Sequence, residues 1–247
     1  VCMYVCMYVC MYVCMYVSMW TYIWPYIWQY IWPHTYIYIY MVICMAIGVV
    51  TFYVRKNIML CAEWLVMFCS GCNVIAWFFT GNDWQWDLIW YLDAFSRIAG
   101  MNLLLYAGFA TLTHNFRPTL WFDGMTLAFI AILTLGFMQS DLLSPARHYA
   151  FSAAHFMFMP LLIFLIYEMR RINKPVLSLL MAATTIMLTV SVVLLDFAAP
   201  AKNDTNLVLN KDFISLMSWG FGYLIICKAY VAMDDHRSRA RSEVGTA

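Results

Sequence analysis

Three ionisable side chains, Asp93, Arg97 and His155, stand within long apolar stretches of this sequence and could act on a small molecule. Such groups are costly inside a membrane-spanning helix, so each is a candidate functional residue. Asp93 precedes Arg97 by four residues, the favourable order for an ion pair on one helix face. Counted along the predicted helices, His155 lies at a similar depth on another helix. We therefore expect a polar pocket in the outer half of the protein, or alternatively an ion pair with only a structural role.

Four further polar residues are candidates with weaker support. Asp196 and Asp212 are expected at the outer ends of their helices, where they would flank the same pocket. Glu63 and Lys228 are each predicted near the cytoplasmic end of a helix, where they could form an inner polar pair. Because a lysine can extend its ammonium group to the membrane surface, the alternative is that these two side chains lie separately at the interface.

No metal site or cofactor is expected from the spacing of possible ligands. His148 and His155 are seven residues apart, about 10 Å along a helix, which is too far for both to bind one zinc ion. The Cys69–Cys72 pair has the spacing of a redox motif but falls in the middle of an apolar stretch. The nine cysteines form no disulfide framework of the secreted type, because four belong to a repeat and five to apolar runs.

The composition indicates that lipid is the solvent for much of the chain. Hydrophobic residues make up 65% of the sequence and charged residues only 11%, far from the balance of a soluble domain. The net charge of +1 gives no electrostatic basis for binding nucleic acid. The lipid bilayer is therefore the expected partner, together with a small lipophilic or polar ligand or another membrane protein.

Seven stretches are long and apolar enough to be membrane-spanning helices. They lie at about 37–54, 58–80, 88–113, 119–138, 149–169, 175–197 and 211–233. The predicted fold is thus an all-α, polytopic transmembrane helix bundle with its folded domain at 36–233. The first stretch reaches full length only by including residues of a decaying repeat, so six spans is the alternative count.

The basic residues orient these spans. The breaks and tail on one side hold nine of them: Arg55, Lys56, Arg117, Arg170, Arg171, Lys174, Arg237, Arg239 and Arg241. The breaks on the other side hold three: Arg147, Lys202 and Lys211. Basic loops stay cytoplasmic, so the N-terminus is predicted outside and the C-terminus inside. A glycosylation sequon at Asn203 falls in a loop placed outside, in agreement.

The two ends of the chain differ from its apolar centre. Residues 1–16 are four copies of Val-Cys-Met-Tyr, which a DNA tract repeating GTAT encodes in one reading frame. We interpret residues 1–35 as a translated tetranucleotide repeat that is not a folded domain. Residues 234–247 form a basic cytoplasmic tail that would be attracted to anionic lipid.

Small residues and tryptophans complete the pattern. Ser96-x-x-x-Gly100 and Ser218-x-x-x-Gly222 predict close helix contacts, because small side chains let backbones approach. Several tryptophans fall near predicted span ends, as an interfacial belt would place them: Trp84, Trp86, Trp90 and Trp121.

Three functions fit this topology, and the topology alone does not distinguish between them. The leading hypothesis is a receptor, sensor or carrier that binds a small ligand in the outer half of the bundle. The first alternative is an intramembrane enzyme acting on a lipid or isoprenoid, with Asp93 and His155 as acid and base. The second is a structural subunit of a membrane complex. The compartment, plasma membrane or endomembrane, is left open.

Overall fold

The structure is a computed structural model that describes residues 32–114, 118–140, 147–197 and 211–245. The chain divides into two compact units, Val1–Ile37 and Tyr38–Ala247. Most of the predicted repeat segment 1–35 lies outside the described residues. Within the described ranges every regular element is a helix and there is no strand, which confirms the predicted all-α class there.

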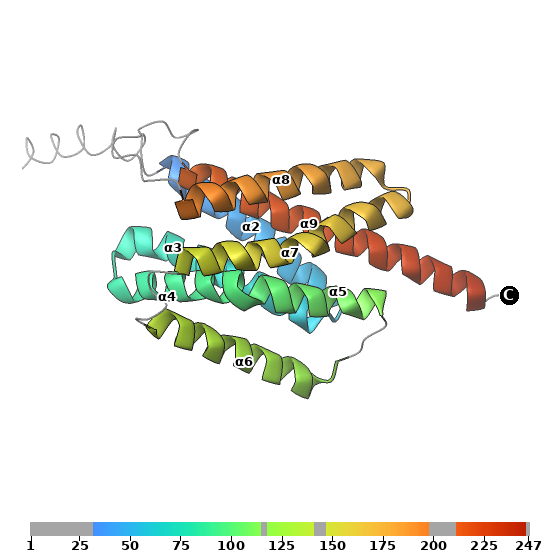
Figure 1. Ribbon diagram of the computed structural model, residues 1–247, viewed down its shortest axis with the longest axis horizontal. Coiled ribbons are helices and arrows are strands. Elements are labelled where there is room, and N and C mark those ends of the chain that lie inside the picture. The colour runs from blue at the N-terminus through green and yellow to red at the C-terminus, as the bar shows by residue number, and fades with distance from the viewer. Residues whose placement is uncertain (1–31, 115–117, 141–146, 198–210, 246–247) are drawn as a thin grey trace, which may run out of the picture. The chain divides into compact units, whose positions relative to one another are not determined.

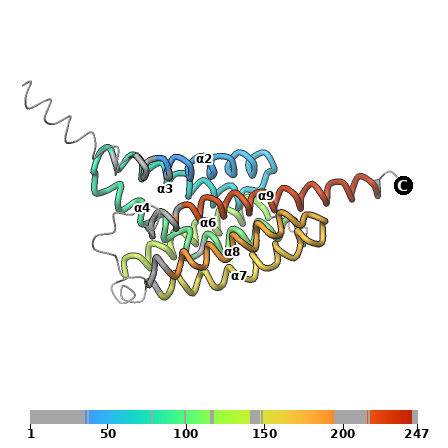
Figure 2. Tube along the Cα trace, turned by 90° about the horizontal axis from the view of Figure 1, so that it is seen from above, coloured from blue at the N-terminus to red at the C-terminus, as the bar shows by residue number. Residues whose placement is uncertain are grey.

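A helical segment stands at each of the seven predicted positions. The elements are α2 (Trp32–Val54), α3 (Ile58–Thr80), α4 (Asp83–Phe95), the π-helix η2 (Ser96–Leu104), α5 (Leu105–Thr113), α6 (Leu120–Gln139), α7 (Arg147–Arg171), α8 (Pro175–Phe197) and α9 (Lys211–Gly245). In the second unit these helices lie side by side along a common direction (Figures 1 and 2). Consecutive helices pack against each other at α7 and α8 and at α8 and α9.

Among the described residues, four helices are long and apolar enough to cross a membrane, which indicates an integral membrane protein. They cover Ile58–Trp77, Leu120–Gln139, Tyr149–Arg171 and Pro175–Val193, and a shorter apolar helix covers Tyr38–Val54. Large apolar side chains remain exposed on their outer faces; Leu120, Trp121 and Ile132 of α6 are 75%, 80% and 69% exposed. A surface of this kind is stable against lipid but not against water.

The third predicted stretch begins earlier than its hydropathy indicates and is divided into α4, the π-helix η2 and α5. Its helix starts at Asp83 rather than residue 88, so the predicted loop 81–87 shrinks to Gly81 and Asn82. Gly81 adopts φ +65°, a conformation that glycine tolerates, and its N–H closes the end of α3 on the Trp77 carbonyl. An acid in the first helical turn, here Asp83, is favourable against the helix dipole. Residues 83–87 are therefore helical although Asp83, Gln85 and Asp87 make this stretch too polar for the predicted span.

The last helix extends beyond the predicted span. Residues 234–245 of the predicted basic tail continue α9 without interruption (Figure 1). Asp234 and Asp235 both form ion pairs with Arg55, which directly follows α2; the Arg55–Asp235 distance is 2.9 Å. Burial alone would lower the pKa of Arg55, but its hydrogen bonds to Asp235 and Asp234 outweigh that effect and raise the pKa above its ordinary value.

Aromatic rings fill the centre of the core between α2, α3 and α9. Trp64 is fully buried, with its ring centroid 4.7 Å from Phe52 and 4.8 Å from Tyr223. A side chain at Gly48 would collide with the Trp64 indole, so this glycine gives the indole its space. These contacts hold α3 and α9 in the rotation that turns Tyr223 toward α3.

One asparagine connects three helices at the predicted cytoplasmic end. Asn57 caps α3 by accepting a hydrogen bond from the Leu60 N–H at 3.2 Å. Its amide nitrogen, which has two hydrogens to donate, lies 3.0, 3.2 and 2.9 Å from three acceptors: the Gly108 carbonyl and the hydroxyl groups of Thr111 and Tyr230. Both ends of this buried side chain are thus hydrogen-bonded, and the network connects α3, α5 and α9.

Candidate functional site

The most buried acid of the described chain is Glu63, on the core-facing side of α3. Its side chain is completely inaccessible to solvent. Its Oε1 accepts hydrogen bonds from the Ser96 hydroxyl, at the start of η2, and from the Tyr223 hydroxyl of α9 at 2.7 Å. Its Oε2 has no hydrogen-bond partner among the described residues. A buried carboxyl group with half of its acceptors unused is costly, so it needs an explanation beyond packing.

The π-helix η2 shapes the place where Glu63 lies. Its nine residues, Ser96–Leu104, form the wider helical turn that often occurs at functional sites. A side chain at Gly100 would collide with Glu63 Oε2, so only glycine leaves room for the carboxyl group. Ser96 and Gly100 therefore make the close helix contact that their spacing predicts. The second small-residue pattern also marks a contact, because Gly222 lies against Leu188 of α8, 3.0 Å from where its side chain would begin.

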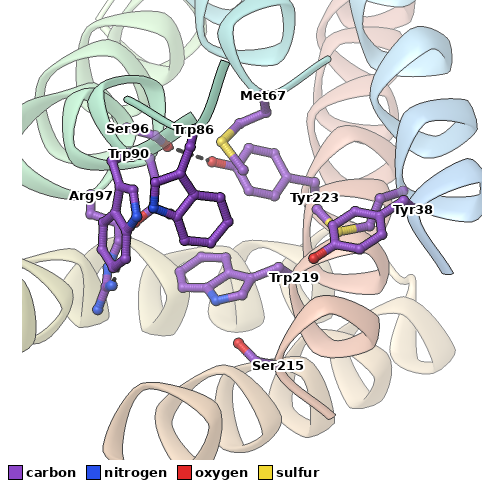
Figure 3. Close-up of a pocket in the computed structure, with 11 residues that line it drawn as sticks. Tyr38, Met67, Trp86, Trp90, Ser96, Arg97, Ser215, Trp219 and Tyr223 are labelled. Carbon is purple, nitrogen blue, oxygen red and sulfur yellow. Dashed lines mark hydrogen bonds and ion pairs between the residues drawn. The ribbon is translucent and has the colours of Figure 1, made fainter. Parts of the chain in front are cut away.

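A cavity of about 360 Å³ lies on the other side of Ser96 and Tyr223. Aromatic residues dominate its wall, with two methionines, two serines and an acid–base pair; the lining comprises Tyr38, Met41, Met67, Trp86, Trp90, Asp93, Ser96, Arg97, Ser215, Trp219 and Tyr223. Figure 3 shows the indoles of Trp86, Trp90 and Trp219 facing this cavity, with the Ser96–Tyr223 contact beside them. We call this cavity the aromatic pocket.

Asp93 and Arg97 form the ion pair predicted from their spacing, and they line the aromatic pocket. The distance from an Arg97 guanidinium nitrogen to an Asp93 oxygen is 3.6 Å. The guanidinium carbon also lies 4.3 Å from the centre of the Phe151 ring on α7, a cation–π contact. The same two residues line a second, larger cavity of about 990 Å³ toward α6 and α7. The pair thus stands in the wall between two cavities.

His155 lies apart from the Asp93–Arg97 pair, so the three residues do not line one common pocket. It is buried on α7, and its Nε2 is 3.3 Å from the Thr189 hydroxyl of α8. Its ring meets the edge of Trp219, with centroids 6.2 Å apart, and it does not belong to the wall of the aromatic pocket. Trp219 therefore stands between His155 and the cavity that Asp93 lines.

The predicted inner pair of Glu63 and Lys228 is not formed. Lys228 is exposed, whereas Glu63 is buried with the hydroxyl groups of Ser96 and Tyr223. The sequence also separated Glu63 from the outer layer that holds Asp93, and this separation is wrong. Ser96 lies three residues after Asp93, lines the aromatic pocket and contacts Glu63, so one region contains all three. The predicted depth of Asp93 is too small because it is counted from residue 88, whereas the helix begins at Asp83.

Three predicted residues cannot be compared with the structure at the level of side chains. Asp196 and Asp212 lie within α8 and α9, but their side chains are outside the described part. Asn203, the predicted glycosylation site, lies wholly outside the described residues. Among the described residues, no group of three or more histidine, cysteine or acidic side chains is arranged to hold a metal ion.

Sequence reasoning missed the aromatic members of this pocket. The sequence predicts an interfacial belt for Trp86 and Trp90 and assigns no role to Trp219 and Tyr223. A signal for the first two was present, because Trp86, Trp90, Asp93 and Arg97 follow the spacing i, i+4, i+7, i+11 of one helix face. No comparable local signal exists for Tyr223, whose partner Glu63 is 160 residues away in sequence.

Comparisons of this chain with known protein families, with curated proteins and with solved structures found no match.

Proposed function

We propose that this protein spans the membrane seven times, with its N-terminus outside and its C-terminus in the cytoplasm, and that it binds a small ligand in the aromatic pocket as a receptor, sensor or carrier. A helical segment at each of the seven predicted positions supports the span count. The excess of basic residues in alternate breaks supports the orientation.

The observation that carries the ligand-binding proposal is the composition of the aromatic pocket. Small-molecule sites are mostly apolar cavities of roughly 300–1,000 Å³ with a few polar groups that fix the ligand's orientation. The aromatic pocket, at about 360 Å³, combines five aromatic residues with one acid–base pair and two serines. Its wall comes from α2, α4, η2 and α9, with Met67 from α3, so a ligand there would contact elements distant in sequence.

The two alternatives have less support. Acid–base catalysis by Asp93 and His155 needs both groups near one substrate, and Trp219 lies between His155 and the aromatic pocket. A purely structural subunit gives no reason for a buried carboxyl oxygen without a hydrogen-bond partner. Ligand binding in the aromatic pocket needs only the residues of its own wall and is compatible with the separate position of His155.

Binding can be tested with purified protein in lipid nanodiscs. Three hexyl probes with different head groups, namely hexyltrimethylammonium, hexanesulfonate and hexyl glucoside, are titrated by calorimetry against protein-loaded and empty nanodiscs. We expect at least one probe to bind saturably, and Trp219→Leu to weaken that binding. Trp84→Leu is the matched control, because Trp84 is 60% exposed and outside the wall of the aromatic pocket. Equal binding by both variants, or only partitioning into lipid, would contradict the proposal.

The topology can be tested by labelling introduced cysteines with a membrane-impermeant reagent. A cysteine at Asn82, between α3 and α4, should react in intact cells. A cysteine at Asn173, between α7 and α8, should react only after permeabilisation. The parent chain provides the background from native thiols. Labelling at Asn173 from outside would reverse the orientation.

A further inference from the structure

Resting on the ligand pocket proposed above, we infer that its ligand is a small organic cation, a protonated amine or a quaternary ammonium compound. Three properties of the aromatic pocket lead to this class: the faces of its rings, the direction of its hydroxyl groups and its balance of charges.

The rings provide surfaces that attract positive charge. Indole and phenol faces carry negative electrostatic potential and bind ammonium groups within about 6 Å of the ring centre, tryptophan most strongly. Trp86 and Trp90 stand edge to face, with centroids 6.0 Å apart and planes at 79°. Trp219 and Tyr223 follow on α9, with centroids 6.2 Å apart. Rings in different orientations around one cavity present faces from several directions, which suits a rounded ammonium group better than a flat ligand.

Two hydroxyl groups of the wall, those of Ser96 and Tyr223, present oxygen rather than hydrogen to the cavity. Ser96 and Tyr223 both donate to Oε1 of Glu63, and a hydroxyl group has only one hydrogen to donate. Their oxygens are 3.0 Å apart and both line the aromatic pocket. These two oxygens therefore offer a ligand lone pairs rather than a hydrogen. Lone pairs favour an N–H donor or a positive charge and disfavour an anion.

The acidic and basic groups near the aromatic pocket favour a positive ligand over a negative one. Arg97 is the basic residue among the described residues of the pocket wall. It forms an ion pair with Asp93 and a cation–π contact with the Phe151 ring on α7. Glu63 adds a second acid directly behind Ser96 and Tyr223, and both of its hydrogen-bond partners are uncharged. Ionising a buried carboxyl group is costly without a positive charge nearby. A cationic ligand against the two hydroxyl groups would offset this cost, whereas an anion would increase it.

The three hexyl probes test this class directly, because they share a chain and differ in charge. We expect hexyltrimethylammonium to bind saturably and at least about tenfold more tightly than hexanesulfonate or hexyl glucoside, a ratio that corresponds to about 1.4 kcal/mol. Glu63→Gln keeps the shape and an acceptor for Ser96 and Tyr223 while removing the acid. It should weaken binding of the cation about tenfold and leave the weak binding of hexyl glucoside unchanged.

The outcomes separate the class of ligand from the existence of the site. If hexanesulfonate or hexyl glucoside binds as tightly as the cation, and Trp219→Leu weakens that binding, the ligand site stands but the cation inference is overturned. If no probe binds saturably to protein that shows a cooperative thermal unfolding transition, both are overturned. If Glu63→Gln weakens binding of the cation and of hexyl glucoside equally, Glu63 acts through the shape of the aromatic pocket, and the charge argument is wrong.

Tyr223→Phe removes one of the two hydroxyl groups. It should weaken binding of the cation more than that of hexyl glucoside, and equal weakening overturns the hydroxyl argument.

Discussion

Two buried polar residues, Asn57 at the N-cap of α3 and Glu63 within this helix, contact the same neighbouring segments of the chain in different ways. Each is hydrogen-bonded to a tyrosine hydroxyl of α9: Asn57 donates to Tyr230, and Glu63 accepts from Tyr223. Each also meets the chain segment that runs from α4 through η2 to α5. Asn57 uses both its oxygen and its nitrogen in hydrogen bonds, whereas Glu63 uses one oxygen and has no partner for the other within the described ranges.

This difference separates a structural site from a candidate functional one. A saturated network such as that of Asn57 stabilises the packing of three helices and has little capacity left for a ligand. An incompletely satisfied acid behind a cavity is less favourable for folding, so its presence indicates a use other than stability. The comparison predicts that substitution costs much stability at Asn57 and little at Glu63. The following changes test it from the largest expected effect to the smallest.

Asn57→Ala should have the largest effect on stability. It removes the cap of α3 and leaves the Tyr230 hydroxyl and the Gly108 carbonyl without this partner, so we expect a loss of about 3 kcal/mol in the free energy of unfolding. Denaturant unfolding in mixed micelles measures it. Asn73→Ala is the matched control, because Asn73 makes a single hydrogen bond, to the Gln85 carbonyl at 2.8 Å. Equal losses in the two variants would refute a special role for Asn57.

Gly100→Ala should destabilise the protein by about 2 kcal/mol, because the new methyl group would collide with the carboxyl group of Glu63. Gly136→Ala on α6 provides the control, since nothing lies within 4 Å of the position of its added methyl group. There we expect no loss, and up to about 1 kcal/mol of gain from improved helix propensity. Thermal unfolding of both variants in the same detergent gives the comparison. A neutral Gly100→Ala would mean that Glu63 can move away freely.

The Asp93–Arg97 pair should contribute modestly to stability. Its 3.6 Å separation and the partial exposure of Asp93 predict a coupling energy of about 1 kcal/mol or less in a double-mutant cycle with Asp93→Leu and Arg97→Leu. A coupling of several kcal/mol would show instead that the pair is a buried structural element of the fold. The same unfolding assay measures all three variants.

Glu63→Gln should change stability least, by no more than about 1 kcal/mol in either direction. The amide keeps an acceptor for Ser96 and Tyr223 and removes the cost of burying an acid, so the two effects oppose each other. A loss as large as that of Asn57→Ala would place Glu63 among the structural residues. That result would remove the distinction between the two sites.

The sequence predicted well those features that depend on neighbours along the chain. The positions of the helices followed from apolar runs and polar breaks, and α3 and α8 begin and end at the predicted residues. The Asp93–Arg97 ion pair depends on a spacing within one helix, as does the shared face of Ser96 and Gly100. These features are local, because one helical geometry determines them.

Only the tertiary structure decided which side chains from different helices meet. A helix that is apolar around its whole circumference gives no hydropathic signal for the face it turns inward, because the lipid-facing and protein-facing residues are equally apolar. The sequence alone could not show that Glu63 meets Tyr223, that His155 meets Thr189 behind Trp219, or that Lys228 is exposed. Shape decided these rotations: Trp64 fills the space at Gly48, and the carboxyl group of Glu63 fills the space at Gly100.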